Sequence, residues 1–259
     1  MDSIKKLRIS VIMSVYNFNR TPMRGVETIL SQSMEDFEFI LVDDGSDKNT
    51  HRILEEYAQK DNRIRLIVNE KRLHLASSLN KAIKLAQAKY IARADVNISY
   101  NPDRLKVQLE FMENHPDIDI LGSNFYWGTD GSDEIREIVL PEMHDHIIRR
   151  LSIACSICHP SVMYKRVALM RYGAYKEGFG WGEDYHLWMR IRNKVKFHNL
   201  HEFLLIKWHR PNPCKELSKI ECFKGNVKSR LAGFSTSPNV LLDLINFPRV
   251  FLIFVVGKN

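Results

Sequence analysis

The sequence lacks a long uninterrupted apolar run. Its most apolar stretch, Val240–Val256, is interrupted by Asp243, Asn246, Pro248 and Arg249, whereas a membrane-spanning helix needs about 20 apolar residues. The amino-terminal segment MDSIKKLRISVIMSVYN differs from a secretory signal because its apolar part is short and strand-like. We therefore expect a chain that stays in a reducing cytoplasm.

Cysteine is scarce, with four residues in a chain of 259. Cys155 and Cys158 have the spacing of a zinc or redox pair, but seven residues separate Cys214 from Cys222. A zinc site would need a second pair of similarly close spacing. We therefore expect buried thiols rather than bound zinc, which suits a reducing compartment.

Glycine-rich phosphate loops are also missing. Neither G-x-x-x-x-G-K-[ST] nor G-x-G-x-x-G follows the first predicted strand, which argues against kinases, ATPases and dinucleotide-dependent dehydrogenases. The net charge of +7 predicts an anionic partner, such as a phosphorylated ligand, a membrane face or nucleic acid. No recognition motif for nucleic acid accompanies the charge, so we expect none to bind. A nucleotide would have to be held by carboxylates and a metal ion.

The first half of the chain alternates strands with helices. Apolar runs predict buried strands at 7–15, 37–42, 64–68 and 90–94. Helices are expected from Thr21-Pro22 onward, and at 50–60 and 75–88. This order indicates an α/β fold with an open, mostly parallel sheet and helices on both faces.

The second half is less regular. Its predicted strands lie at 118–127, 135–140, 161–164 and 195–208, and its predicted helices at 101–114, 165–172 and 183–193. The chain beyond residue 210 is expected to be mostly helical.

Polar clusters follow three of the predicted parallel strands. They are Val15-Tyr16-Asn17, Asp43-Asp44 and Asp95-Val96-Asn97, and ligands of such sheets bind beyond the carboxyl ends of the strands. On an extended chain, residues 95 and 97 point to the same side, where oxygen ligands suit Mg²⁺ or Mn²⁺. The alternatives are ordinary turn chemistry at Asp43-Asp44-Gly45-Ser46 and an Asx turn at 95–97.

A further carboxylate pair, Glu183-Asp184, opens a predicted helix after the loop Gly180-Trp181-Gly182. Complementing the helix dipole is one reading of this pair. The same dipole would keep a carboxylate ionised for service as a general base, and Trp181 offers a flat face for a sugar ring.

Together these segments resemble the inverting glycosyltransferase family 2, which has a GT-A fold, in its bacterial surface-polysaccharide form. The resemblance spans about residues 7–210 and rests on Ser-Val-Tyr-Asn (14–17), Val-Asp-Asp-Gly-Ser (42–46), Ala-Arg-Ala-Asp-Val-Asn (92–97), His-Pro-Ser-Val-Met (159–163) and Gly-Glu-Asp-Tyr-His-Leu-Trp (182–188). These five motifs in this order are specific to the family.

The resemblance implies a role for each matching residue. Asp184 would be the catalytic base, and Glu183 and Trp181 would contact the acceptor. The donor would be a nucleoside-diphosphate sugar, with UDP as the first candidate nucleotide. Its binding residues would be Ser14, Tyr16, Asn17, Asp43, Asp44, Lys71, Arg72, Arg93 and Asp95. Asp95, Asn97 and His209 would hold the divalent cation. The family usually has proline at position 14 and aspartate at position 97. An amide oxygen is a weaker ligand for a hard cation than a carboxylate.

The reaction implied is transfer of a hexose to a hydroxyl of a glycan or lipid-linked saccharide by single displacement. Two alternatives stay open: a non-catalytic scaffold that binds nucleotide or glycan, and a sugar-phosphate nucleotidyltransferase. A nucleotidyltransferase would need a glycine-rich basic loop after the first strand, and residues 14–20 do not form one.

The predicted organisation is a nucleotide-sugar-binding half at 1–97 and an acceptor-binding half at 98–210 of the same GT-A domain. A helical extension at 211–259 follows. Residues 240–256 could lie in a membrane interface or pack on the core. The first option would place the protein at the inner face of the cell membrane.

Overall fold

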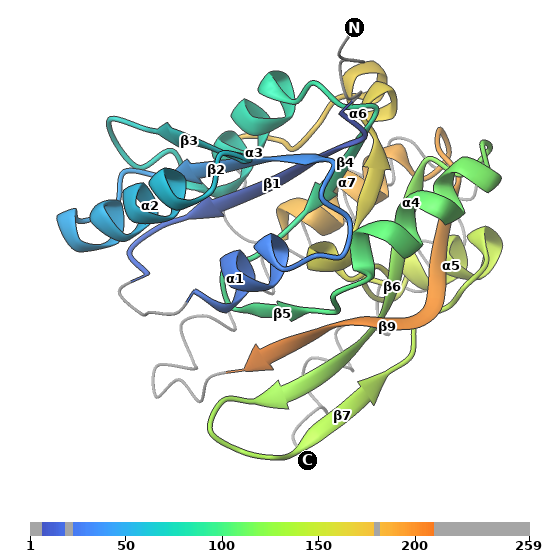
Figure 1. The fold of residues 1–259 in the computed structure, drawn as a ribbon. Helices are drawn as coiled ribbons and strands as arrows, with labels where there is room; N and C mark the ends of the chain where they lie inside the picture. Colours follow the sequence, from blue (N-terminus) through green and yellow to red (C-terminus); the bar gives the residue numbers. More distant parts are fainter. Residues whose placement is uncertain (1–6, 19–22, 179–181, 210–259) are drawn as a thin grey trace, which may run out of the picture.

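The computed structural model describes residues 7–18, 23–178 and 182–209, which form one central sheet with helices on both faces (Figure 1). The strands are β1 Ile9–Val15, β2 Phe37–Asp43, β3 Ile64–Val68, β4 Tyr90–Arg93, β5 Ile98–Tyr100, β6 Ile120–Thr129, β7 Ile135–Ile138, β8 Met163–Lys165 and β9 Phe197–His209. The α-helices are α1 Arg24–Leu30, α2 Lys48–Lys60, α3 His74–Leu85, α4 Arg104–Asn114, α5 His144–Leu151, α6 Arg166–Tyr172 and α7 Glu183–Ile191, with a 3₁₀ turn, η1, at His159–Ser161.

The sheet has the strand order β3-β2-β1-β4-β8-β6-β9-β5, and β7 pairs with β6 as a hairpin. Strands β1 to β4 are parallel to one another, and β8 then pairs antiparallel with both β4 and β6. β6 and β9 are parallel, and β5 is antiparallel to β9. The mostly parallel α/β sheet predicted from the sequence is therefore confirmed, with three antiparallel strands added to it.

Side-chain alternation along the strands divides the core between the two faces of the sheet. On one face, α1, α2 and α4 pack on Ile9, Val11 and Met13 of β1. On the other, α3, α5, α6 and α7 pack on residues that include Ile12 of the same strand. Because β1 to β4 are parallel, their polar carboxyl ends all lie at one edge of the sheet.

Several predicted boundaries are wrong by a few residues. The first helix begins at Arg24 with Met23 in the N-cap position, so the sequence signal at Thr21-Pro22, outside the described residues, does not mark its start. The second helix begins at Lys48 because the Asp47 side chain accepts a hydrogen bond from Thr50 N and caps it. Gly173 ends α6 at φ 82°, as predicted.

β5, α5 and η1 were not predicted from the sequence. β5 has only three residues, and α5 (HDHIIRRL) has only two buried ones, Ile147 and Leu151. Among the helices of the described ranges, none combines the length and apolarity that crossing a bilayer requires. The predicted helical extension at 211–259 lies outside those ranges.

Candidate active site

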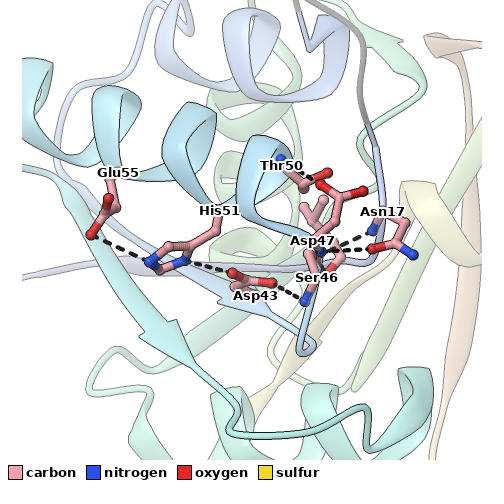
Figure 2. A network of polar contacts seen from close by, with 8 residues as sticks. Asn17, Asp43, Ser46, Asp47, Thr50, His51 and Glu55 are labelled. Carbon is pink, nitrogen blue, oxygen red and sulfur yellow. Dashed lines mark hydrogen bonds and ion pairs between the residues drawn. The ribbon is translucent and has the colours of Figure 1, made fainter.

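Asn17 ties the end of β1 to the start of α2. It adopts a left-handed backbone (φ 47°), and its Oδ1 accepts a hydrogen bond from Asp47 N at 2.9 Å. Its own N–H donates to Ser46 Oγ at 3.2 Å, and Asp47 in turn caps α2 (Figure 2). Asn17 therefore lies at the predicted sheet edge, where its carbonyl oxygen holds the loop together.

Asp43 is buried at the end of β2, and both of its oxygens are engaged. Oδ1 accepts a hydrogen bond from Ser46 N at 2.9 Å, and Oδ2 lies 2.8 Å from His51 Nδ1, whose ring also faces Glu55 (Figure 2). These contacts match the turn-chemistry reading of the sequence for Asp43.

Asp44 organises the loop that joins β3 to α3. Its Oδ1 accepts hydrogen bonds from Asn69 Nδ2 at 3.0 Å, Leu73 N at 2.7 Å and Ser78 Oγ at 2.8 Å. Gly45, at φ 69°, approaches this loop so closely that an added Cβ would lie 2.6 Å from the Lys71 carbonyl carbon. Asp44 and Gly45 together fix the segment that carries two predicted donor-binding cations.

Those cations are Lys71 and Arg72, and both are exposed. The Arg72 guanidinium lies 4.0 Å from the centroid of the Tyr16 ring, which is 40% exposed at the end of β1. A cation over a flat ring is a favourable pairing. Ser14 lies half-buried on β1, so the structure brings the first, second and third strand ends together at this edge.

The end of β4 carries an ion pair between the buried Arg93 and the half-buried Asp95. Arg93 is 1% exposed, and its Nε has no hydrogen-bond partner among the described residues. Asp95 N donates to Tyr100 Oη at 2.7 Å, and the Asp95 side chain stays 31% exposed. A fixed cation therefore lies directly beside a carboxylate that solvent can reach.

The expectation that residues 95 and 97 lie on an extended chain is wrong. Val96 and Asn97 form a turn, and Gly25 N donates to Val96 O at 2.9 Å. An added Cβ on Gly25 would lie 1.9 Å from Asp95 O, so only glycine lets α1 pack this closely on the turn. Gly25 could not be singled out from the sequence, because its importance comes from this close approach.

Asp95 and Asn97 offer oxygen donors that suit Mg²⁺ or Mn²⁺. In residues 7–18, 23–178 and 182–209, no three His, Cys, Asp or Glu side chains are grouped to hold an ion. His209 pairs with Thr129 through its backbone in β9, and its side chain lies outside the description. Asp95 and Asn97 therefore supply one carboxylate and one amide among the described residues, which is not a complete ligand set.

The carboxylate pair Glu183-Asp184 opens α7 after Gly182, which has φ 80°. Asp184 Oδ1 accepts a hydrogen bond from Tyr185 N at 2.8 Å, and its side chain is 24% exposed. Burial, followed by the charge of Asp184, raises the pKa of Glu183 to about 7. Burial also raises the pKa of Asp184, against the opposing effects of Tyr185 N–H, Lys207 and Arg93.

The helix dipole was expected to keep a carboxylate ionised at this position, and burial opposes it by raising the pKa of both side chains. Arg93 acts electrostatically on both carboxylates, and Asp95 acts on Glu183. The strand-end cluster and the start of α7 therefore belong to one site. Trp181, the predicted acceptor-binding residue, lies outside the described residues.

Two further residues, His159 and Lys207, act on Asp184, and neither was given a role from the sequence. His159 Nδ1 lies 4.0 Å from Asp184 Oδ2, and Lys207 lowers the pKa of Asp184 from its place on β9. His159 lies in the His-Pro-Ser-Val-Met motif, which was a usable signal. Lys207 pairs in register with Ile98 and Trp127, and its position depends on tertiary pairing.

Two cavities lined by described residues lie away from the strand-end residues. A cavity of about 850 Å³ is lined by Phe37 and Arg63, and one of about 590 Å³ by Ile118 and Phe197, all near the amino ends of strands. In an α/β sheet the carboxyl edge is the ligand-binding edge. We therefore locate the site from the strand-end chemistry rather than from volume.

A parallel half-sheet with carboxylates at its carboxyl edge is joined to a mixed half-sheet, and a helix that begins with a second carboxylate pair packs on the sheet. This arrangement is typical of the GT-A class of nucleotide-sugar-dependent transferases. The chain belongs to glycosyl transferase family 2, whose model matches residues 10–173. Both the family and the fold predicted from the sequence are thereby confirmed.

Curated relatives agree with this assignment. The chain is 36% identical over 217 residues to the uncharacterized glycosyltransferase MJ1057 of Methanocaldococcus jannaschii, covering 82% of this chain and 74% of the relative. It is 31% identical over 250 residues to the O-antigen biosynthesis glycosyltransferase WbnJ of Escherichia coli, covering 94% and 96%. The chain is therefore a transferase by family.

Solved structures share the fold at low sequence identity. TarS of S. aureus in complex with UDP-GlcNAc superposes with a TM-score of 0.71 at 18% identity, covering 97% of this chain and 73% of that one. The mannosyltransferase PcManGT of Pyrobaculum calidifontis, in complex with GDP-Man and Mn²⁺, gives 0.68 at 16% identity, covering 95% and 70%.

Proposed function

We propose that this chain is an inverting glycosyltransferase that moves a hexose from a nucleoside-diphosphate donor to a hydroxyl of a glycan or lipid-linked saccharide. UDP is the first candidate for the donor nucleotide. The observation that carries the proposal is Asp184, a carboxylate that is 24% exposed beside the Arg93–Asp95 pair. An accessible base next to a fixed cation is what activation of an acceptor hydroxyl requires.

The reaction is a single displacement. The acceptor oxygen bonds to the anomeric carbon while the bond from that carbon to the phosphate oxygen breaks, and its electron pair leaves with the nucleoside diphosphate. Asp184 takes the hydroxyl proton, and Glu183 contacts the acceptor together with Trp181. The charge that develops on the leaving group is stabilised by cations of the chain, with Arg93 and Lys207 on the described strands.

The donor half is residues 1–97, and the acceptor half is residues 98–210. Tyr16 offers its ring to the base, with Arg72 above it. Ser14 and Lys71 complete the donor surface, while the carboxylates and amide already engaged in the loops (Asn17, Asp43 and Asp44) shape it. A nucleotide sugar is named in two neighbouring structures, as UDP-GlcNAc and GDP-Man.

Asp95 and Asn97, joined by His209, would hold a divalent cation on the donor diphosphate. When bound, such an ion would neutralise diphosphate charge as a Lewis acid. Mn²⁺ is named in the PcManGT structure, which supports this ion as the first choice.

A lipid-linked or surface-polysaccharide acceptor is supported by the relative named for O-antigen biosynthesis. We propose that the enzyme works at the cytoplasmic face of the membrane, with residues 240–256 as the contact. Flotation of the full chain and of a chain ending at residue 239 with anionic liposomes tests this. Equal flotation of the two would contradict it.

The central experiment replaces Asp184 by Asn and measures both donor binding and turnover. Calorimetry with UDP-GlcNAc and GDP-mannose in the presence of Mn²⁺ should give an unchanged Kd, because Asp184 serves the acceptor. Donor hydrolysis should fall by about 10² to 10⁴-fold. Asp145→Asn, which removes an exposed carboxylate from the first turn of α5, is the matched control.

Retained turnover in Asp184→Asn would overturn the base assignment. Donor binding by the native chain with no hydrolysis or transfer under any tested condition would instead indicate the non-catalytic scaffold.

A further inference from the structure

We propose that His159, Tyr175 and Tyr164 form a buried hydrogen-bond chain that ends on Asp184 and positions its carboxylate for proton transfer. They are positioning residues that act through Asp184. The proposal rests on the proposed function only in taking Asp184 as the base, and the hydrogen-bond chain can be tested without it.

The chain crosses three separate segments. Tyr164 on β8 places its hydroxyl 3.0 Å from the hydroxyl of Tyr175, which lies between α6 and α7. The Tyr175 hydroxyl lies 2.6 Å from Nε2 of His159 in η1, and Nδ1 of the same ring lies 4.0 Å from Asp184 Oδ2. All three members are buried, at 0%, 4% and 7% exposure for Tyr164, Tyr175 and His159.

Proton counting gives the chain a direction. A neutral imidazole donates from one ring nitrogen and accepts at the other. With Asp184 ionised, Nδ1 must carry the hydrogen, because a bare lone pair would face a carboxylate. Nε2 then accepts from Tyr175, which accepts from Tyr164. The separation of 4.0 Å is longer than a hydrogen bond, and such contacts commonly tighten when substrate binds.

The chain stays neutral across the physiological range. Burial, aided by Arg93 and Lys207, lowers the pKa of His159 well below its usual value. Burial raises the pKa of Tyr164 to about 12 and that of Tyr175 well above its usual value. His159 therefore offers Asp184 a fixed N–H and does not compete with it as a second base.

The orientation of the imidazole is set by packing around it. Asn80 on α3 holds the Tyr175 backbone in both directions, donating to its carbonyl at 2.8 Å and accepting from its N–H at 3.0 Å. The Trp188 ring meets His159 edge-on, with centroids 6.2 Å apart. A donor held this firmly loses little entropy when it engages the carboxylate.

The charged and titratable groups that face Asp184 come from every element packed around it: Glu183 on α7, Arg93 on β4, Lys207 on β9, His159 in η1, Cys155 between α5 and η1, and Tyr175 between α6 and α7. Among them, His159 and Tyr175 belong to the hydrogen-bond chain, and replacing either one removes a neutral donor without changing the net charge. Substitutions at these two positions therefore test the hydrogen-bond chain separately from the charge of the site.

The first test needs no substrate. In the ¹⁵N-histidine-labelled full chain, long-range ¹H–¹⁵N spectra report the tautomer of each of the ten imidazoles, and His159 is assigned by the signal that disappears in His159→Gln. We expect a non-titrating Nδ1–H tautomer from pH 5.5 to 8.5, and a mixture of tautomers in Tyr175→Phe. An Nε2–H tautomer in the native chain, or an imidazolium that forms near pH 6.5, would overturn the proposal.

The second test is the pH profile of UDP-GlcNAc and GDP-mannose hydrolysis. His159→Phe and Tyr175→Phe should lower kcat by about 10 to 100-fold with KM within twofold, and should move the acid limb to higher pH because the base loses a donor. His159→Gln, whose amide can donate, should recover part of both effects.

His186→Gln is the matched control, because it removes a buried imidazole from α7 that responds to Arg190 and Lys176. It should keep the native acid limb. Folded His159→Phe and Tyr175→Phe variants with a native limb and native kcat would refute the positioning role. Full turnover in Asp184→Asn would refute the base assignment instead, and the tautomer result would still stand.

Discussion

Replacing Glu183 by Gln should stabilise the protein at neutral and alkaline pH but not at acidic pH. The native protein holds the Glu183 proton up to a pKa of about 7, whereas the unfolded chain releases it near 4.5. Between these values the native state binds more protons, so stability falls as pH rises through this window. A Gln side chain carries no such proton and removes the dependence.

The difference between the two pKa values corresponds to about 3 kcal/mol. This is the upper limit of the stabilisation, because part of the shift comes from the charge of Asp184. We therefore expect Glu183→Gln to raise the free energy of unfolding by about 1–3 kcal/mol at pH 8 and by almost nothing at pH 4.5.

Urea unfolding at pH 4.5, 6 and 8 measures this directly. Glu110→Gln, which neutralises an exposed carboxylate on α4, is the control and should shift the urea midpoint little at any pH. A stability difference that is the same at pH 4.5 and pH 8 would refute the reasoning, because a buried carboxylate with a raised pKa must give a pH-dependent one.

Two further predictions concern the donor side of the site. Gly25→Ala should lower the free energy of unfolding by about 1–3 kcal/mol and weaken donor binding, since its Cβ would collide with Asp95 O. A lower thermal stability together with an unchanged calorimetric Kd for the donor would contradict the expected loss of donor binding. Arg72→Ala should raise the donor KM about fivefold at similar kcat, since it removes the cation over Tyr16, and the exposed Arg65→Ala on β3 should leave KM unchanged.

The regular half of the fold could be read from the sequence because local and tertiary preferences agree there. β3 was predicted to the residue, and β1, β2 and β4 to within two, since buried parallel strands are short apolar runs. β8 was expected near its position, but its insertion between β4 and β6 was not. Antiparallel pairing between segments this far apart in the sequence, such as Tyr90 with Lys165, leaves no local pattern.

The site was predictable in part for the same reason. The strand-end position of Asp44 and Asp95 follows from topology, so those residues could be placed in advance. The turn at Val96-Asn97 could not, because it depends on the approach of Gly25. The pKa of Glu183 could not either, because burial is a property of the packed chain rather than of helix position.

The strand β5 makes the segment from Asp95 to Tyr100 a fixed length of chain. Ile98 and Tyr100 are buried. The Ser99 hydroxyl accepts a hydrogen bond from the indole N–H of Trp208 on β9, and the Tyr100 hydroxyl accepts one from Asp95 N. One inserted residue would turn the buried pair outward and break both bonds. This stretch therefore admits a change of side chain at Asn97 far more readily than a change of length, so variation here can alter a ligand without moving the strand that presents it.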